Sequence, residues 1–457
     1  MRKIVLTLVA AMVLSWQSSS FAASSVDALI QKLEDKGILT NQEAAQLKDQ
    51  VTGDEQTNEQ ATFKSLLPDW INGFKLSGDF RFRTQTNYRK VPLTAANTYN
   101  FRQTRERIRA RLNFEDQIND KFKIVVGIAT DGGTPRSNNY TLGGQTTKEN
   151  GNTTTSFIDT DDFGKPALVL NKAYAVYTPN DMITAMVGKM DNPIWEAAGA
   201  SFFWDPDITP EGGTIQIQKK INDYITPFAQ ETVLDLHDLA PSTTVKTDPY
   251  MMVTQGGIKG NLTDQVYYKA GVTWYDINNP SHYVDTTLST GTNTTTTGPA
   301  GTTILKYNFD DVIVEGAEIG INDPFGDMLP SPIYIPQAGV FGDFANNYSK
   351  GDEQSKAWEM GAYVGNSAIN GWGTWKLSSY YKVLERDSWL DVLPDDDFYS
   401  GDTDTKGWRS ELDLGLAKNV WFVMSYFNAN VFKYYGTSTM SKSAPDNTFQ
   451  MDLNLKF

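Results

Sequence analysis

The chain has no cysteine and almost no histidine, and both absences limit its chemistry. Its 457 residues include no Cys and only two His, His237 and His282, both in predicted loops. Without Cys, disulfides and Cys-based metal sites are excluded. The sequence also lacks a nucleophile elbow, a Walker loop and a helix with paired metal-binding histidines. We therefore expect a protein that is not an enzyme and that uses no metal or cofactor.

Basic residues are in the minority. Lys and Arg number 40 against 55 Asp and Glu, which gives a formal net charge of −15 at pH 7. A nucleic-acid-binding protein needs a basic surface over which the phosphates can lie. Nucleic acid is therefore not an expected partner of this chain.

Long apolar runs are missing as well, apart from a short one near the N-terminus. A transmembrane helix needs about 20 apolar residues, whereas the run over residues 4–14 is shorter. It follows the basic pair Arg2-Lys3 and precedes residues 20–22, Ser-Phe-Ala, which match a small-x-small cleavage pattern. This order predicts a signal peptide over residues 1–22 that is removed on export. The alternative is an N-terminal membrane anchor.

Residues 25–60 are polar, charged and poor in aromatics, unlike the rest of the chain. Apolar residues recur there at helical spacing, at Val26, Leu29, Ile30 and Leu33. Thr40 and Glu43 have the spacing of a capping box that opens a second helix. We expect a periplasmic helical hairpin and linker over residues 23–68. It would either self-associate or contact a periplasmic or cell-wall partner, and a loosely structured spacer is the alternative.

From Phe74 onward, apolar and polar residues alternate. The first stretch sets Phe74, Leu76, Gly78, Phe80 and Phe82 against Lys75, Ser77, Asp79, Arg81 and Arg83. This period of two is typical of a β-strand with one apolar and one polar face. Similar stretches continue to the end of the chain and predict about sixteen strands. Their expected spans are 74–87, 101–114, 121–131, 166–178, 182–191, 213–220, 222–234, 250–260, 264–276, 303–321, 331–346, 354–366, 371–385, 406–418, 419–434 and 447–457.

The connections between the predicted strands alternate in length. Short turns such as 178–181 and 418–419 alternate with long polar segments such as 132–165 and 277–302. Outer-membrane β-barrels have this asymmetry, with tight periplasmic turns and long outer loops. We therefore expect residues 69–457 to form an all-β fold, a transmembrane antiparallel β-barrel of about sixteen strands.

The C-terminal strand distinguishes a membrane barrel from a soluble sandwich. One of its faces is continuously apolar, with Phe449, Met451, Leu453, Leu455 and Phe457. Exposed at the end of a soluble protein, such a strand would promote aggregation. In a closed barrel it pairs with the first strand and faces lipid. With its final aromatic residue, this strand resembles the assembly signal of Gram-negative outer-membrane proteins. The resemblance implies that these five residues are a membrane-insertion signal, and we expect outer-membrane lipid around the barrel.

Basic residues are concentrated on the polar face of the first three predicted strands. They are Lys75, Arg81, Arg83, Arg105, Arg107, Arg109, Arg111, Lys121 and Lys123. Arginine on the lipid face would cost about 2–4 kcal/mol at the midplane, so we expect these side chains to line a pore. Basic side chains in a water-filled pore lower the barrier for anions. The alternative is that they pair with carboxylates and only support the wall.

One predicted outer loop differs from the others in composition. Residues 192–212 combine several aromatic residues with four acids, Glu196, Asp205, Asp207 and Glu211. Such aromatic side chains are unusual in a freely solvated loop. We hypothesise that this loop folds into the barrel and places its acids opposite the basic wall, where it forms a constriction. The alternative is a loop that packs on the rim.

Several short stretches resemble the putative porin family of Gram-negative bacteria. They are residues 36–44 in the N-terminal segment, residues 107–112 and residues 187–195. The resemblance implies a trimeric outer-membrane channel through which small hydrophilic solutes or ions diffuse passively, either generally or with a preference for anions. A structural or adhesive outer-membrane barrel whose outer loops bind a partner is the alternative.

Overall fold

The structure is a computed structural model of the chain. The residues that it describes are 74–92, 98–143, 147–149, 152–154, 165–199, 201–238, 248–278, 293–297, 303–306, 308–328, 334–349, 353–433 and 445–457. The predicted signal peptide, the predicted helical hairpin and His282 lie outside these residues.

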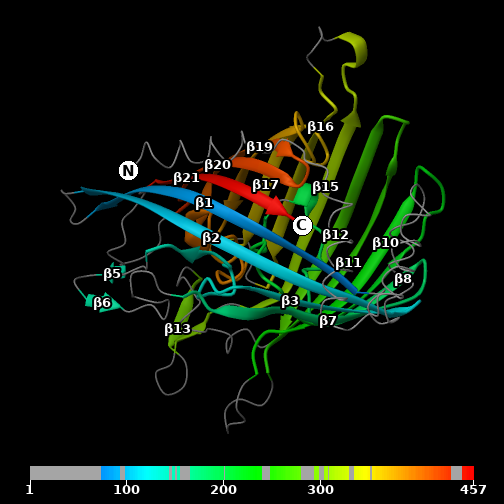
Figure 1. Cartoon of the computed structure of the whole chain (residues 1–457). Coiled ribbons are helices and arrows are strands. Elements are labelled where there is room, and N and C mark those ends of the chain that lie inside the picture. The colour runs from blue at the N-terminus through cyan, green and yellow to red at the C-terminus, as the bar shows by residue number, and fades with distance from the viewer. Residues whose placement is uncertain are drawn as a thin grey trace, which may run out of the picture. The chain divides into compact units, whose positions relative to one another are not determined.

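Sixteen strands form one closed ring. Each is antiparallel to its neighbours, and the last strand closes the ring by pairing with the first, as Figure 1 shows for β21 and β1. The strands are β1 (Phe74–Pro92), β2 (Thr98–Asn119), β3 (Phe122–Thr130), β7 (Leu168–Asn180), β8 (Ile183–Lys189), β9 (Glu211–Gln218), β10 (Thr226–Asp235), β11 (Tyr250–Asn261), β12 (Val266–Asn278), β15 (Phe309–Asn322), β16 (Gln337–Asn347), β17 (Lys356–Gly365), β18 (Trp375–Leu384), β19 (Thr405–Ala417), β20 (Val420–Val431) and β21 (Asp446–Lys456).

This ring confirms the predicted fold class, an antiparallel barrel of sixteen strands. Each predicted strand span overlaps one strand of the ring. One clear difference lies in the predicted strand 303–321. There β15 begins only at Phe309, because Thr303–Leu305 forms β14 and pairs with β13 (Thr295–Thr297) instead of with the ring.

The remaining described elements are short. They are β4 (Tyr140–Thr141), which pairs with β2, the hairpin of β5 (Thr147–Glu149) and β6 (Asn152–Thr154), and the 3-10 turns η1 (Ala197–Gly199), η4 (Gly326–Met328) and η5 (Tyr399–Gly401). Within the residues described, no helix is both long enough and apolar enough to cross a bilayer.

Asparagine side chains organise several of the tight turns. Asn119, Asn180 and Asn222 each accept two backbone N–H groups from the residues two and three positions ahead. Such Asx turns reverse the chain without help from distant residues. Asn419 adopts a left-handed φ of 61° between β19 and β20, a conformation that Asn tolerates better than most residues. Local sequence therefore determines where these strands reverse.

The alternation of side chains gives the wall two chemically distinct faces. On β1, Phe80 is 38% exposed, whereas Arg83 and Gln85 are 5% and 3% exposed. On β21, Phe449 is exposed and its neighbour Gln450 is buried. The apolar residues therefore face outward, where lipid surrounds a membrane barrel. The polar residues face an interior that other parts of the chain partly fill.

Two long connections occupy part of that interior. The connection from β8 to β9 will be called loop A (residues 190–210), and the one from β18 to β19 loop B (residues 385–404). The Phe203 ring of loop A stacks on Trp389 of loop B with 4.5 Å between ring centroids. Trp389 also contacts Tyr275 of β12 at 4.7 Å, and all three rings are buried. The two loops therefore share an apolar core inside the barrel.

Candidate functional site

The arginines of β1 and β2 lie side by side on the inner face. The strand register places Arg81 opposite Arg109, and Arg83 opposite Arg107. Gln85 lies opposite Arg105, and Asp79 lies opposite Arg111. Because side chains alternate along a strand, all six predicted arginines share the face of the buried Arg83. The structure therefore brings this part of the predicted basic set together.

The three predicted lysines do not join the arginines. Lys75 lies opposite Glu115 near the start of β1 and is exposed. Lys123 forms an ion pair with the same carboxylate, with 3.2 Å between Nζ and Oε2. Lys121 is exposed in the turn between β2 and β3. These lysines therefore lie near that turn, at the opposite end of the β1–β2 pair from Arg105.

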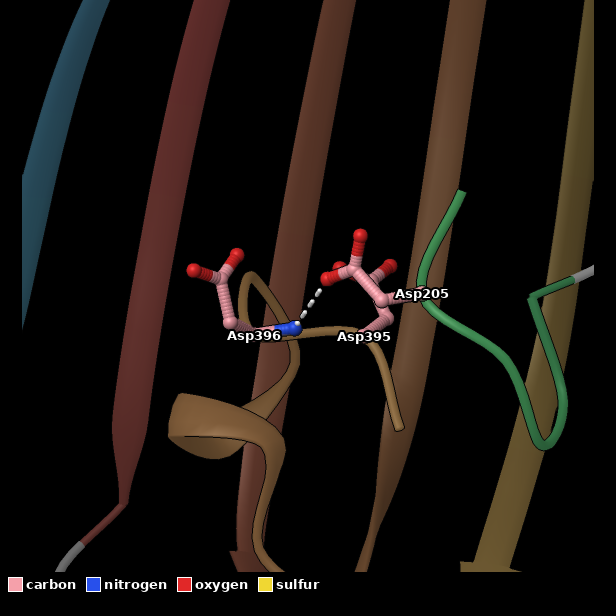
Figure 2. A group of neighbouring side chains, drawn as sticks. All are labelled: Asp205, Asp395 and Asp396. Atoms are coloured by element: carbon pink, nitrogen blue, oxygen red, sulfur yellow. Dashed lines mark hydrogen bonds between the residues drawn. The ribbon is translucent and has the colours of Figure 1, made fainter. Parts of the chain in front are cut away.

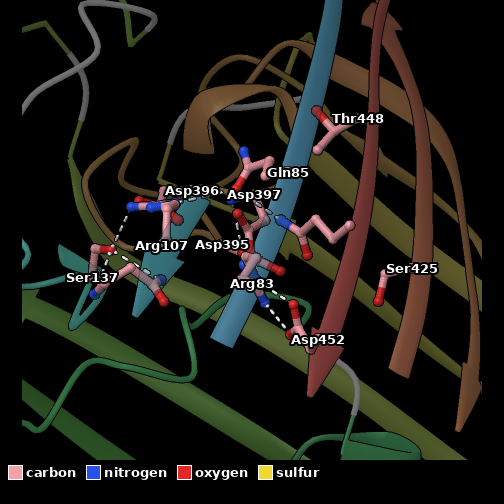
Figure 3. Close-up of polar contacts among 12 residues, drawn as sticks. Arg83, Gln85, Arg107, Ser137, Asp395, Asp396, Asp397, Ser425, Thr448 and Asp452 are labelled. Carbon is pink, nitrogen blue, oxygen red and sulfur yellow. Dashed lines mark hydrogen bonds and ion pairs between the residues drawn. The ribbon is translucent and has the colours of Figure 1, made fainter. Parts of the chain in front are cut away.

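Most of these arginines have carboxylate partners. Arg83 makes a bidentate contact with Asp452 at 2.8 and 2.9 Å, and it also contacts Asp397 at 2.7 Å. Figure 3 shows Arg83 between these two acids. Arg109 and Arg111 both bind Asp79, at 3.0 and 2.7 Å. Much of the positive charge predicted from the sequence is therefore neutralised within the protein.

Arg105 and Arg107 differ from the others. Arg105 donates to the Asn87 amide oxygen at 3.3 Å. Arg107 donates to Gln85 and to Ser137, each at 3.2 Å. Among the described residues neither arginine forms an ion pair within 4.0 Å, and the Nε of each has no hydrogen-bond acceptor. These two guanidinium groups therefore carry positive charge that the surrounding protein does not pair directly.

Loop A crosses the interior between two parts of the wall. Asp207 accepts a hydrogen bond from Arg109 of β2 at 3.2 Å. At the other end of the loop, the N–H of Ala197 donates to Asp343 of β16 at 3.2 Å, and that of Ala198 to Glu318 of β15 at 2.6 Å. Polar contacts therefore attach loop A to the wall in both of its halves.

The four acids predicted for a constriction have different environments. Glu196 is buried and accepts N–H groups from Phe202 at 3.1 Å and Phe203 at 2.9 Å, so it stabilises the loop internally. Burial raises the pKa of Glu196 to about 8. Asp207 faces the arginines, and although burial opposes ionisation, Arg109 lowers the pKa of its carboxyl. Asp205, the third acid, faces loop B.

Glu211 is not brought into the interior. It is the first residue of β9 and pairs with Lys189 of β8, with 2.7 Å between Nζ and Oε1. Both share the wall face of Val187 and Ile215, which are 63% and 53% exposed. Glu211 therefore lies on the outward face of the barrel, apart from the other three predicted acids.

Loop B supplies acids that the sequence analysis did not single out. Asp397 binds Arg83, and although burial opposes this, Arg83 lowers the pKa of Asp397. Trp389 donates its indole N–H to the carbonyl of Phe203 at 3.0 Å. The signal was available in the sequence, because residues 389–398 combine aromatic residues with an Asp-Asp-Asp run. The same combination pointed to loop A.

Three carboxylates meet where loops A and B touch. Asp205, Asp395 and Asp396 have carboxylate oxygens that lie within 4.8 Å of one another, and Figure 2 shows them side by side. Asp205 accepts backbone N–H groups from Asp207 at 2.8 Å and from Asp396 at 2.9 Å. Burial, together with the neighbouring carboxylates, raises the pKa of Asp205, and it raises that of Asp396 to about 7. Protonation near neutral pH can therefore relieve the repulsion among them.

A cavity of about 240 Å³, the central cavity, lies among these charged groups. Its lining includes Arg81, Arg83 and Arg109 from the arginine wall and acids from both loops. A second cavity of about 510 Å³, the turn-side cavity, is lined by Asn370 and Asn419 from two short turns and by the C-terminal Lys456 and Phe457. The interior thus contains spaces large enough for several water molecules, bordered largely by charged and polar groups.

A closed barrel with an apolar outer face and a charged interior has the architecture of an outer-membrane channel. The model of the putative porin family matches residues 85–309 and 335–457. The chain belongs to the putative porin family, and its place is the Gram-negative outer membrane.

Solved porins resemble the chain in structure at low sequence identity. A triple mutant of the Rhodopseudomonas blastica porin is 12% identical, with 84% of this chain and 100% of that chain covered and a TM-score of 0.38. The outer membrane channel DcaP of Acinetobacter baumannii is 13% identical, with 84% and 98% covered and a TM-score of 0.39. A comparison with curated protein sequences finds no match.

Proposed function

We propose that the protein is a passive diffusion channel for small hydrophilic solutes, with an anion-preferring step formed by Arg105 and Arg107. The observation that carries the proposal is the pair of inward guanidinium groups without carboxylate partners among the described residues. They lie on the part of β2 nearer its connection to β1, which is the outer end of the strand. Anions coming from outside therefore meet positive charge first.

Charges are balanced in pairs beside Arg107, at Arg83 on the neighbouring strand, and one step further along β2, at Arg109. The guanidinium groups of Arg83 and Arg109 face Asp397 and Asp207, which the two loops bring to the wall. Charges of opposite sign across a narrow passage produce a transverse field. Such a field orients polar solutes and excludes apolar ones, because an apolar molecule gains nothing in exchange for displacing the hydrating water.

The test is the reversal potential of the channel in a planar bilayer with a KCl gradient. We expect Arg105→Ser combined with Arg107→Ser to shift the reversal potential towards cation preference, because two unpaired positive charges leave the path. The matched control is Lys189→Ser combined with Lys406→Ser. This control removes two positive charges from the outward face and is expected to leave the reversal potential unchanged. An unchanged value in the arginine variant would sink the proposed anion step.

The proposal extends to assembly and export. We infer a homotrimer in outer-membrane lipid, export through a cleaved signal peptide at residues 1–22, and periplasmic or cell-wall contact through residues 25–60. These statements rest on the family and on the N-terminal sequence. Deletion of residues 25–60 tests the last of them. A deletion that leaves the oligomer intact but abolishes cell-wall association assigns the segment to contact, whereas loss of the oligomer assigns it to assembly.

A second candidate function is a structural or adhesive barrel with a closed interior. The apolar core formed by Phe203, Trp389 and Tyr275 favours this candidate, because it fills part of the barrel. The two functions differ in conductance. A channel gives stepwise currents after reconstitution, whereas a closed barrel gives none.

A further inference from the structure

The central and turn-side cavities share two lining residues. Asp413 of β19 and Trp421 of β20 border both spaces. In the strand register Asp413 lies opposite Val423, and Trp421 lies opposite Gly415, so the two side chains share the inner face and are diagonal neighbours. We call these two residues the neck. A solute that moves between the two cavities passes it.

The Asp413 carboxylate is available to such a solute. Among the described residues no ion pair or side-chain hydrogen bond engages it, and it is only partly buried. Glu411, two residues earlier on the same face, contrasts with it: it binds Arg409 at 2.7 Å and accepts from Ser425 at 2.8 Å. The cross-strand partner of Asp413 is Lys376, whose Nζ lies 5.3 Å from the centre of the Tyr363 ring.

The neck has the chemistry of a weak site for cationic groups. A free carboxylate attracts an ammonium or guanidinium group, and the face of an indole ring adds a favourable cation–π contribution. Asp413 lies four residues before the end of β19 at Ala417, whereas Arg107 lies twelve residues before the end of β2 at Asn119, and both strands end at periplasmic turns. The path therefore carries unpaired charge of opposite sign at two successive levels.

The geometry points to Asp413 and Trp421 as a second selectivity point that favours cationic groups on the periplasmic side. This inference rests on the proposed channel function. A zwitterionic solute, with one anionic and one ammonium group, meets a complementary charge at each level. An anion of the same size meets a favourable charge at the outer level and an opposing one at the neck. Free amino acids are therefore expected to pass faster than simple carboxylates of similar size.

Cysteine chemistry tests the neck directly, because the chain contains no native Cys. Asp413→Asn is expected to shift the reversal potential in a KCl gradient towards anion preference. In Asp413→Cys, a sulfonate-bearing thiol reagent restores a negative charge and is expected to return the value to that of the wild type. An ammonium-bearing reagent is expected to shift it further towards anions. Glu315→Gln is the control, because it removes one negative charge from the exposed outward face of β15.

The possible outcomes separate the neck from the channel itself. In a conducting channel, Asp413→Asn and both labels could leave the reversal potential unchanged. That result would refute the proposal that the neck selects cationic groups. The proposal would also be refuted if neither reagent labelled the thiol at position 413 in the folded, conducting channel. Absence of any current in the wild-type protein would instead refute the proposed channel function.

Discussion

Glu196 links the position of loop A to pH. Its carboxyl is buried and bonded to two N–H groups of its own loop, and its pKa rises from 4.5 to about 8. The protonated form is therefore favoured in the folded loop. The resulting stabilisation is complete at pH values below the ordinary pKa of 4.5, and it is lost as the pH rises through about 8.

This linkage predicts that loop A loosens as the pH rises. The stabilisation is lost between the ordinary pKa of 4.5 and the raised value of about 8, so we expect the open-channel current noise of the wild type to increase over that range and to level off above it. Glu196→Gln keeps an uncharged side chain of the same shape at every pH and should remove most of that increase. The measurement is single-channel noise against pH. Identical noise curves for the two proteins would show that Glu196 does not control the loop.

At the residue scale, the sequence predicts on which face of a strand each side chain lies, but it does not predict where each strand begins and ends. The six arginines share one face because they fall at alternate positions of two long strands. Glu211 was assigned to a loop because the predicted strand begins at residue 213, whereas β9 begins two residues earlier. Those two residues place Glu211 in the ladder beside Lys189 and turn its side chain outward.

At the scale of elements, loops A and B depend on each other. Trp389 contacts Phe203, Trp204 and Tyr275 and is fully buried. Removing a buried Trp side chain costs about 3–5 kcal/mol in a folded core. Here the lost stabilisation affects the packing of the two loops and leaves the barrel intact, because Trp389 lies in loop B and takes no part in strand pairing.

Trp389→Ala should therefore enlarge the passage while the barrel stays assembled. We expect a higher single-channel conductance and faster proteolysis of loops A and B. Trp408→Ala is the matched control, since Trp408 lies on the outward face and is 50% exposed. Equal conductance in the Trp389 variant and the wild type would show that the shared core does not restrict the path.

The interior position of loop B was not predicted because it depends on contacts between distant parts of the chain. Trp389 and Phe203 are 186 positions apart, and Asp397 and Arg83 are 314 apart. Local patterns cannot reveal such pairs. The sixteen strands, in contrast, depend on alternation and on turns a few residues long, so their order and approximate spans could be predicted.

At the scale of the whole molecule, the closure of the ring depends on the C-terminus. Gly78 and Phe457 exchange two backbone hydrogen bonds of 3.0 Å each. A Cβ atom on Gly78 would lie 2.5 Å from Cζ of the Phe457 ring, so the terminal ring rests directly on the glycine. The predicted insertion signal thus ends at the seam between the last strand and the first.

Phe457→Ala should accordingly reduce the amount of barrel that assembles, because the terminal ring and its apolar area are lost. The measurement is the heat-modifiable, folded fraction in isolated outer membranes. Phe122→Ala provides the control, because Phe122 is a similarly exposed aromatic residue on β3 away from the seam. Equal folded fractions in both variants and the wild type would show that Phe457 does not contribute to the assembly of the barrel.

The central claim is that the barrel conducts even though loops A and B lie inside it. Single-channel recording of the purified, folded protein in a planar bilayer tests that claim most directly. The claim predicts stepwise currents that persist at low voltage and scale with salt concentration. A folded protein that inserts into the bilayer and carries no current would contradict it and would favour the closed, adhesive barrel.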